Sequence, residues 1–96
     1  FIPSDRTQSY HMYYLLLPGL TQRQAFIARL KEQEILSVFH YLPLHLSDMG
    51  MRFGGKPGDC PVTERISDQL VRLPFFYNLT DEEQDRVIEA IISQPV

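Results

Sequence analysis

The sequence predicts an α+β fold, a two-layer sandwich in which a small, mainly antiparallel sheet is covered by about three helices. Short apolar runs that stop at Pro or Gly are typical of strands, and amphipathic segments with capping residues are typical of helices. The two kinds of segment follow one another in the order β-α-β-loop-α-β-α. With 96 residues, the chain makes one small domain or a piece of a larger one.

The first half of this order rests on two apolar runs and one helix. Ser9–Leu17 is aromatic and aliphatic and stops at Pro18-Gly19, which favours a buried strand. Thr21 is the expected N-cap of the next helix, which should end near Gln33. Its buried face should hold Phe26, Ile27 and Leu30, and its solvent face Arg23, Arg29 and Lys31. Ile35–Tyr41 then changes to a period of two, which predicts a second strand.

The second half contains two helices around a third strand. Asp59 or Cys60 should cap a helix that has Pro61 in its first turn and an apolar stripe of Val62, Ile66 and Leu70. Val71–Leu73 is the expected third strand. Thr80 and Glu83 have capping-box spacing and predict the start of the last helix. The expected buried face of that helix consists of Val87, Ile88, Ile91 and Ile92, and Pro95 should end it.

The stretch Phe39–Gly55 carries the chemistry. After Pro43 it is expected to run as a long loop, and loops beyond roughly 12–15 residues in a compact domain are usually functional or disordered. Imidazole, phenol and guanidinium groups, which hydrogen-bond polar or phosphorylated ligands, are concentrated here. The candidate site residues are His40, Tyr41, His45, Arg52 and Phe53.

Other interpretations of these residues remain open. His40 fits a half-buried strand residue bonded to backbone groups, His45 a solvated loop histidine, and Tyr41 a sheet-edge residue with its polar tip in water. A metal site at His40 and His45, with Cys60 or Asp48, lacks the two closely spaced ligand pairs of zinc sites. We therefore expect no metal, and we expect no nucleophilic catalysis at Cys60.

Composition restricts partners and compartment. The net charge is −3 and Lys31 and Lys56 are the only lysines, which argues against nucleic-acid and anionic-membrane binding. A single cysteine and the lack of a long apolar run favour a cytoplasmic protein. The chain begins with Phe1, so we expect residues 1–8 to be a linker from an N-terminal large domain, a processed mature chain being the alternative.

Three motifs together resemble a known family. They are the aromatic run His11–Tyr14, the segment V-F-H-Y-L-P-L-H at Val38–His45, and the segment from Cys60 to Thr80 that includes L-P-F-F-Y-N-L. Their order resembles the C-terminal end of the DegT/DnrJ/EryC1 sugar aminotransferases, which are pyridoxal-phosphate enzymes of the aspartate-aminotransferase fold. The resemblance implies that residues 9–96 form the small C-terminal domain of such an enzyme.

The resemblance also implies roles. The large domain of the family holds the cofactor and the Schiff-base lysine, so no catalytic or cofactor-binding residue is expected in this chain. Tyr41 and His45 would contact the nucleotide-sugar substrate, with His40 as a further candidate. The implied reaction of the whole enzyme, a homodimer, is amino transfer, usually from glutamate, onto a 4-keto-6-deoxy nucleotide sugar in surface polysaccharide biosynthesis. Neither lysine sits in a setting suited to Schiff-base chemistry, so the chain alone should be inactive.

Two rival interpretations remain. A stand-alone ligand-binding or dimerisation module would have a polar surface without a large apolar patch. A dehydratase on the same scaffold, with the lysine replaced, is not distinguishable from these residues. If the chain is a domain of a larger enzyme, apolar side chains should be exposed where the large domain or a second copy packs, namely Tyr13, Leu42, Leu44, Met49, Met51 and Phe53.

Overall fold

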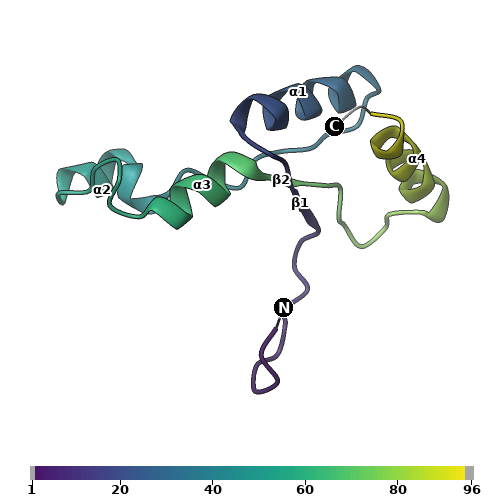
Figure 1. Cartoon of the computed structure of the whole chain (residues 1–96). Helices are drawn as coiled ribbons and strands as arrows, with labels where there is room; N and C mark the ends of the chain where they lie inside the picture. Colours follow the sequence, from purple (N-terminus) through teal and green to yellow (C-terminus); the bar gives the residue numbers. More distant parts are fainter. Residues whose placement is uncertain (1, 95–96) are drawn as a thin grey trace.

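The computed structural model describes residues 2–94 and confirms an α+β fold. A two-stranded antiparallel sheet is accompanied by four helices (Figure 1). In chain order the elements are β1 (Tyr14–Leu16), α1 (Leu20–Glu32), the 3₁₀ turn η1 (Leu44–Leu46), α2 (Asp48–Arg52), α3 (Pro61–Gln69), β2 (Leu70–Arg72) and α4 (Asp81–Ile92). The segment before β1 extends away from the rest of the fold.

The sheet is smaller than the sequence predicts. β1 pairs with β2 so that Leu15 lies opposite Val71. The predicted strand Ile35–Tyr41 is wrong, because only Val38 pairs, through an isolated bridge to Arg72 on β2. Beyond Val38 the chain turns away from β2, and at Tyr41 the backbone has a φ of 47°, which no extended strand contains. The predicted first strand, Ser9–Leu17, is confirmed only over Tyr14–Leu16.

Helix α1 begins without the expected cap and ends where the sequence predicts, with Gln33 as its C-cap. It starts at Leu20 after Gly19, which makes no side-chain cap hydrogen bond, so the Thr21 capping box is wrong. At its other end, the N–H of Ile35 donates to the carbonyl of Leu30 at 2.9 Å and the N–H of Glu34 to that of Lys31 at 2.9 Å. This is a Schellman motif, with Glu34 at a φ of 60° in the left-handed position that usually holds glycine. The turn directs Ile35 back into the core.

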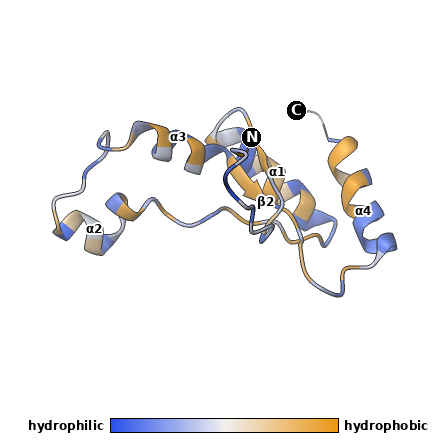
Figure 2. Ribbon diagram, turned by 90° about the horizontal axis from the view of Figure 1, so that it is seen from below, coloured by the Kyte–Doolittle hydropathy of each residue, from blue (hydrophilic) through white to orange (hydrophobic). Residues whose placement is uncertain are grey.

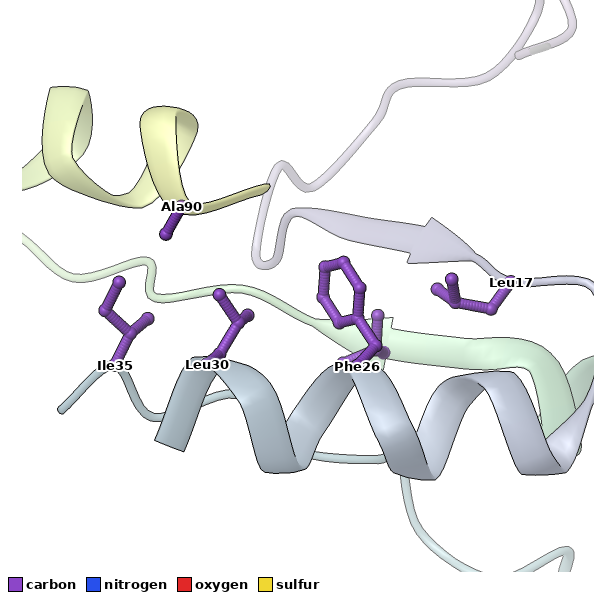
Figure 3. Packing of buried hydrophobic residues seen from close by; sticks show 6 residues of the cluster. Leu17, Phe26, Leu30, Ile35 and Ala90 are labelled. Atoms are coloured by element: carbon purple, nitrogen blue, oxygen red, sulfur yellow. The ribbon is translucent and has the colours of Figure 1, made fainter. Parts of the chain in front are cut away.

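The hydrophobic core lies between α1, the sheet and α4 (Figure 3). Phe26 and Leu30 point from α1 toward the strands, and Ala90 points from α4 toward Ile35 and Leu30. Leu30 and Val71 are fully buried. The buried members of the cluster are Leu17, Phe26, Leu30, Ile35, Val71 and Ala90.

Arg23 is an exception to the predicted faces of α1. It was expected on the solvent face, and it is 7% exposed. Its guanidinium donates to the backbone carbonyl of Ser67 on α3 and lies 5.7 Å from the centre of the Phe39 ring. Arg23 therefore joins α1 to α3. The periodicity of apolar residues does not predict this role, because it assigns charged residues to the solvent face.

An arm projects from this core. It consists of η1, α2 and α3 with their connections, and Figure 1 shows α2 far from α1 and α4. The expected long loop is therefore partly helical. Ser47 caps α2 by accepting from the N–H of Gly50 at 3.0 Å and donates its hydroxyl to the carbonyl of Leu44 at 2.7 Å. Cys60 is the N-cap of α3 and Pro61 its first residue, as predicted.

Helix α4 closes the core at the opposite end from the arm (Figure 2). The Thr80–Glu83 capping box is confirmed. Its predicted buried face is confirmed only in part, because Val87 and Ile91 pack on the core, whereas Ile88 and Ile92 are 43% and 76% exposed. Ala90 takes the central position instead. The expected stop at Pro95 lies outside the described residues.

Candidate functional site

Two of the three predicted site residues lie in one groove. His40 and Tyr41 face the exposed side of α3 across an open groove of about 480 Å³. The groove is lined by the chain from 40 to 44, by α3 and by the start of β2. Its polar members are His40, Tyr41, Thr63 and Ser67. His45 does not line this groove, so the structure separates it from the other two.

Tyr41 is held in an unusual position. It is 69% exposed and adopts a left-handed backbone conformation, which is rare for an aromatic residue and costs energy. Its carbonyl accepts the hydroxyl of Ser67 at 3.4 Å. Its ring meets the edge of the His40 ring at 5.2 Å between centroids, and the guanidinium carbon of Arg72 lies 5.5 Å from the ring centre. The Tyr41 side chain is therefore exposed to solvent, and its ring contacts both His40 and Arg72.

His40 is half-buried, and its Nδ1 atom has no hydrogen-bond partner among the described residues. Backbone groups were one expected set of partners for this ring, and the structure does not supply one at Nδ1. A buried ring nitrogen without a partner is uncommon in folded proteins and is often found where a ligand or water binds.

His45 contributes to the structure of the arm through a contact with Glu64. Its Nε2 lies 3.3 Å from a carboxylate oxygen of Glu64, an ion pair when the imidazole is protonated, although the geometry is not that of a hydrogen bond. The Glu64 carboxylate also accepts the N–H groups of Gly58, at 3.0 and 3.1 Å, and Cys60, at 3.3 Å. The Gly58 N–H lowers the pKa of Glu64 most, His45 and Cys60 lower it further, and desolvation opposes them.

Glycines bring the backbone close around His45. A Cβ on Gly55 would lie 2.1 Å from the carbonyl oxygen of His45, and one on Gly50 would lie 2.0 Å from that of Leu44. Both positions therefore need glycine for close backbone approach.

The guanidinium near the site comes from Arg72 and not from Arg52. Arg52 is the last residue of α2 and is exposed, and Phe53 beside it is 86% exposed. Arg72 reaches Tyr41 from β2, where it also forms the isolated bridge to Val38. The signal that could have found it is its place in the sequence, since a charged residue between Val71 and Leu73 interrupts an otherwise apolar strand.

Neither lysine suits a pyridoxal-phosphate site. Lys56 pairs with Asp59 at 3.3 Å and its side chain is 74% exposed, and Lys31 is exposed at the end of α1. Schiff-base lysines need a desolvated or cationic setting, which neither has. Within residues 2–94, no three His, Cys, Asp or Glu side chains gather as metal ligands. In the same range, no helix is long and apolar enough to cross a bilayer.

Comparison with known proteins gives consistent results. The DegT/DnrJ/EryC1/StrS aminotransferase family matches residues 1–92. The chain is 37% identical over 87 residues to a pleiotropic regulatory protein of Geobacillus stearothermophilus, covering 90% of this chain and 23% of that protein. It is 31% identical over 83 residues to the dTDP-3-amino-3,4,6-trideoxy-alpha-D-glucose transaminase of Micromonospora megalomicea subsp. nigra, covering 84% and 22%.

Solved structures agree. The aminotransferase TlmJ of Streptoalloteichus hindustanus superposes with a TM-score of 0.78 at 29% identity, over 94% of this chain and 23% of TlmJ. Spr1654 of Streptococcus pneumoniae, described as a sugar aminotransferase and solved in the PMP form, gives 0.79 at 28% identity over 91% and 23%. The chain thus spans about a quarter of the proteins it matches. It belongs to the DegT/DnrJ/EryC1/StrS aminotransferase family.

Proposed function

We propose that residues 9–96 are the small C-terminal domain of a cytoplasmic, pyridoxal-phosphate-dependent aminotransferase, with residues 1–8 as the linker from its large domain. The substrate of the whole enzyme is a 4-keto-6-deoxy nucleotide sugar used in surface polysaccharide biosynthesis. The family match and a relative named as a dTDP-amino-sugar transaminase support this proposal. A further relative is named as a spore coat polysaccharide biosynthesis protein of Bacillus subtilis.

The observation that carries the proposal is the large accessible surface area of the chain. Its accessible area is 7,668 Å², whereas a compact protein of this mass exposes about 5,700 Å². Its radius of gyration is 15.7 Å, against about 12–13 Å for a compact domain of this length. An excess of roughly 2,000 Å² is the area of a large interface within a protein or between subunits. The large domain or a second copy of the enzyme would cover it.

The exposure of apolar residues also supports the proposal. All six residues expected at the contact with the large domain or a second copy are exposed by 48% or more. They are Tyr13, Leu42, Leu44, Met49, Met51 and Phe53. Five of them surround the groove of His40 and Tyr41 or lie on the arm beyond it. A stand-alone module would have buried or replaced such side chains.

Within this enzyme, Tyr41 would contact the nucleotide-sugar substrate and His40 would lie beside it. His45 would act indirectly, because its ring pairs with Glu64 and holds the arm. Pyridoxal phosphate supplies an electron sink when it is bound. The lysines of this chain do not fit that cofactor, so we place its site in the large domain.

The ring carbon that receives the amine differs among the proteins that this chain resembles. The sequence motifs resemble dTDP-4-amino-4,6-dideoxygalactose transaminase, but the relatives are named for other sugars, including dTDP-3-amino-3,6-dideoxy-alpha-D-galactopyranose in Aneurinibacillus thermoaerophilus. Amination at carbon 4 therefore stays a prediction.

The test compares the chain with a longer protein that carries it. We expect the longer protein, loaded with pyridoxal phosphate, to transfer the amino group of glutamate to a 4-keto-6-deoxy nucleotide sugar. The 96-residue chain, treated with pyridoxal phosphate and borohydride, should form no stoichiometric lysine adduct. An adduct at Lys31 or Lys56, found by mass spectrometry, would contradict the proposal. A longer protein that dehydrates the sugar without aminating it would favour the dehydratase.

A further inference from the structure

Arg72 is a partly buried cation without an acceptor. Among residues 2–94, no oxygen accepts a hydrogen bond from its guanidinium, and its Nε atom is buried. No carboxylate lies within ion-pair distance of it in the described part of the chain. Its one side-chain contact of note is the Tyr41 ring, 5.5 Å from the guanidinium carbon. A partly desolvated charge with no partner is unfavourable.

Two other arginines have a backbone acceptor for a terminal nitrogen, although the Nε atom of Arg23 is also buried without a partner. The guanidinium of Arg23 donates to the carbonyl of Ser67, and that of Arg86 donates to the carbonyl of Gln33. Arg52 and Arg65 are exposed, so water serves their donors. The Nε atom of Arg72 is buried without a partner, and no acceptor for the guanidinium is found among the described residues, although the residue as a whole is partly open to solvent.

The neighbours of Arg72 can complete a site for an oxyanion. The Tyr41 ring covers one side of the guanidinium and presents a phenol to solvent. His40 stands edge-on to that ring and has an unpartnered Nδ1. The acidic residues near this part of the fold, Glu64 and Asp68, line a separate groove on the side of Arg23. The charge on Arg72 is therefore not neutralised from that side.

We propose that Arg72, with the phenol of Tyr41 and the ring of His40, binds a phosphate group, the diphosphate of the nucleotide sugar. The planar fork of a guanidinium matches two phosphate oxygens, and the phenol can donate a third hydrogen bond. The identification of the ligand as a nucleotide sugar rests on the proposed function. The proposed anion site does not, since it is argued from the guanidinium without an acceptor and from its neighbours Tyr41 and His40.

The test measures binding of inorganic pyrophosphate to the 96-residue chain by amide chemical-shift changes at low ionic strength. We expect the shifts to centre on Arg72 and Tyr41. Arg72→Gln should weaken binding roughly tenfold or more, because it removes a charge-assisted bond. Arg72→Lys should keep part of the affinity, since it keeps the charge but not the fork. Arg52→Gln is the matched control and should change affinity less than about twofold, as a screened surface charge does.

Competing ligands separate the sources of the phosphate. Thymidine diphosphate should displace pyrophosphate, whereas glutamate, whose anionic groups are carboxylates and not phosphates, should not do so at equal concentration. An equal loss in Arg52→Gln and Arg72→Gln would overturn the site. Pyrophosphate binding that depends on Arg72 without displacement by thymidine diphosphate would keep the anion site and overturn the nucleotide assignment. An inactive longer protein with intact pyrophosphate binding would overturn the proposed function alone. An Arg72→Lys variant that binds as tightly as the original chain would overturn the bidentate geometry.

Discussion

The core and the arm are held together by different forces. Around α1, β2 and α4, apolar side chains are buried, and Leu30 and Val71 are closed off from solvent entirely. On the arm, none of η1, α2 and α3 contains a buried residue. Both regions nonetheless have regular secondary structure. The difference shows that this chain builds one region by burial and the other by polar contacts and close backbone approach.

The polar contacts of the arm form a connected set. Ser47 closes the turn before α2, the N–H of Gly55 donates to the carbonyl of Gly50 at 2.9 Å, and Glu64 joins the 58–60 turn to His45. Because these bonds fix the backbone, apolar side chains of the arm need not turn inward. They remain available for a contact with another domain or subunit, as the proposed function requires.

Removing a core side chain should produce the largest effect. Leu30→Ala deletes buried methyl groups beside Phe26 and Val71, and such changes cost about 2–5 kcal/mol of the free energy of unfolding. A chain of this size has little stability to lose, so we expect the variant to be largely unfolded. Urea unfolding followed by circular dichroism would measure it. Leu44→Ala on the arm, at a position 83% exposed, is the control and should change the midpoint little.

Equal midpoints for Leu30→Ala and Leu44→Ala would contradict the division into a buried core and an arm without one. A large loss in Leu44→Ala alone would mean that the arm is covered in solution, and sedimentation would then show a dimer or larger species.

A methyl group at Gly55 should have the next largest effect, confined to the arm. Its Cβ would lie 2.1 Å from the carbonyl oxygen of His45, so the turn has to open. We expect Gly55→Ala to speed amide exchange of Met51 and Phe53, while Leu30 keeps its protection. Gly19→Ala is the control, because its new Cβ meets only the end of the flexible Gln22 side chain at 3.1 Å in extended backbone. Loss of protection at Leu30 in Gly55→Ala would show that arm and core unfold as one unit.

Sequence patterns predicted the core better than the arm, for a physical reason. The buried face of α1 at Phe26 and Leu30 follows the helical period, which burial imposes directly. Two predicted strands are present with shifted bounds, whereas the failure of the Ile35–Tyr41 strand and the presence of α2 escaped prediction, because both depend on contacts far apart in sequence. Val38 pairs with Arg72, and α2 is five residues long with a glycine inside it, which propensity disfavours.

The site shows the same limit. The density of polar groups pointed to His40 and Tyr41, which do share a groove. Spacing along the chain could not show that His45 would turn to Glu64, or that the nearby guanidinium would come from β2, more than thirty residues away. Contacts between segments far apart in the sequence decided both, since α3 brings Glu64 to His45 and β2 brings Arg72 to Tyr41.

The smallest expected effect is the pH dependence of the arm. Hydrogen bonds from Gly58 and Cys60 and the nearby His45 lower the pKa of Glu64 below its ordinary value of 4.5. A carboxyl whose pKa is lower in the folded state stabilises that state above the unfolded pKa, and this stabilisation is lost as the pH falls through the folded pKa. Solvent screening keeps the contribution small. We therefore predict that the amide resonances of Gly58 and Cys60 titrate with a midpoint below 4.5, and that Glu64→Gln abolishes this titration. A midpoint at or above 4.5 would mean that desolvation outweighs the hydrogen bonds, and the arm would then owe its shape to the glycine contacts around His45 instead of to the Glu64 carboxylate.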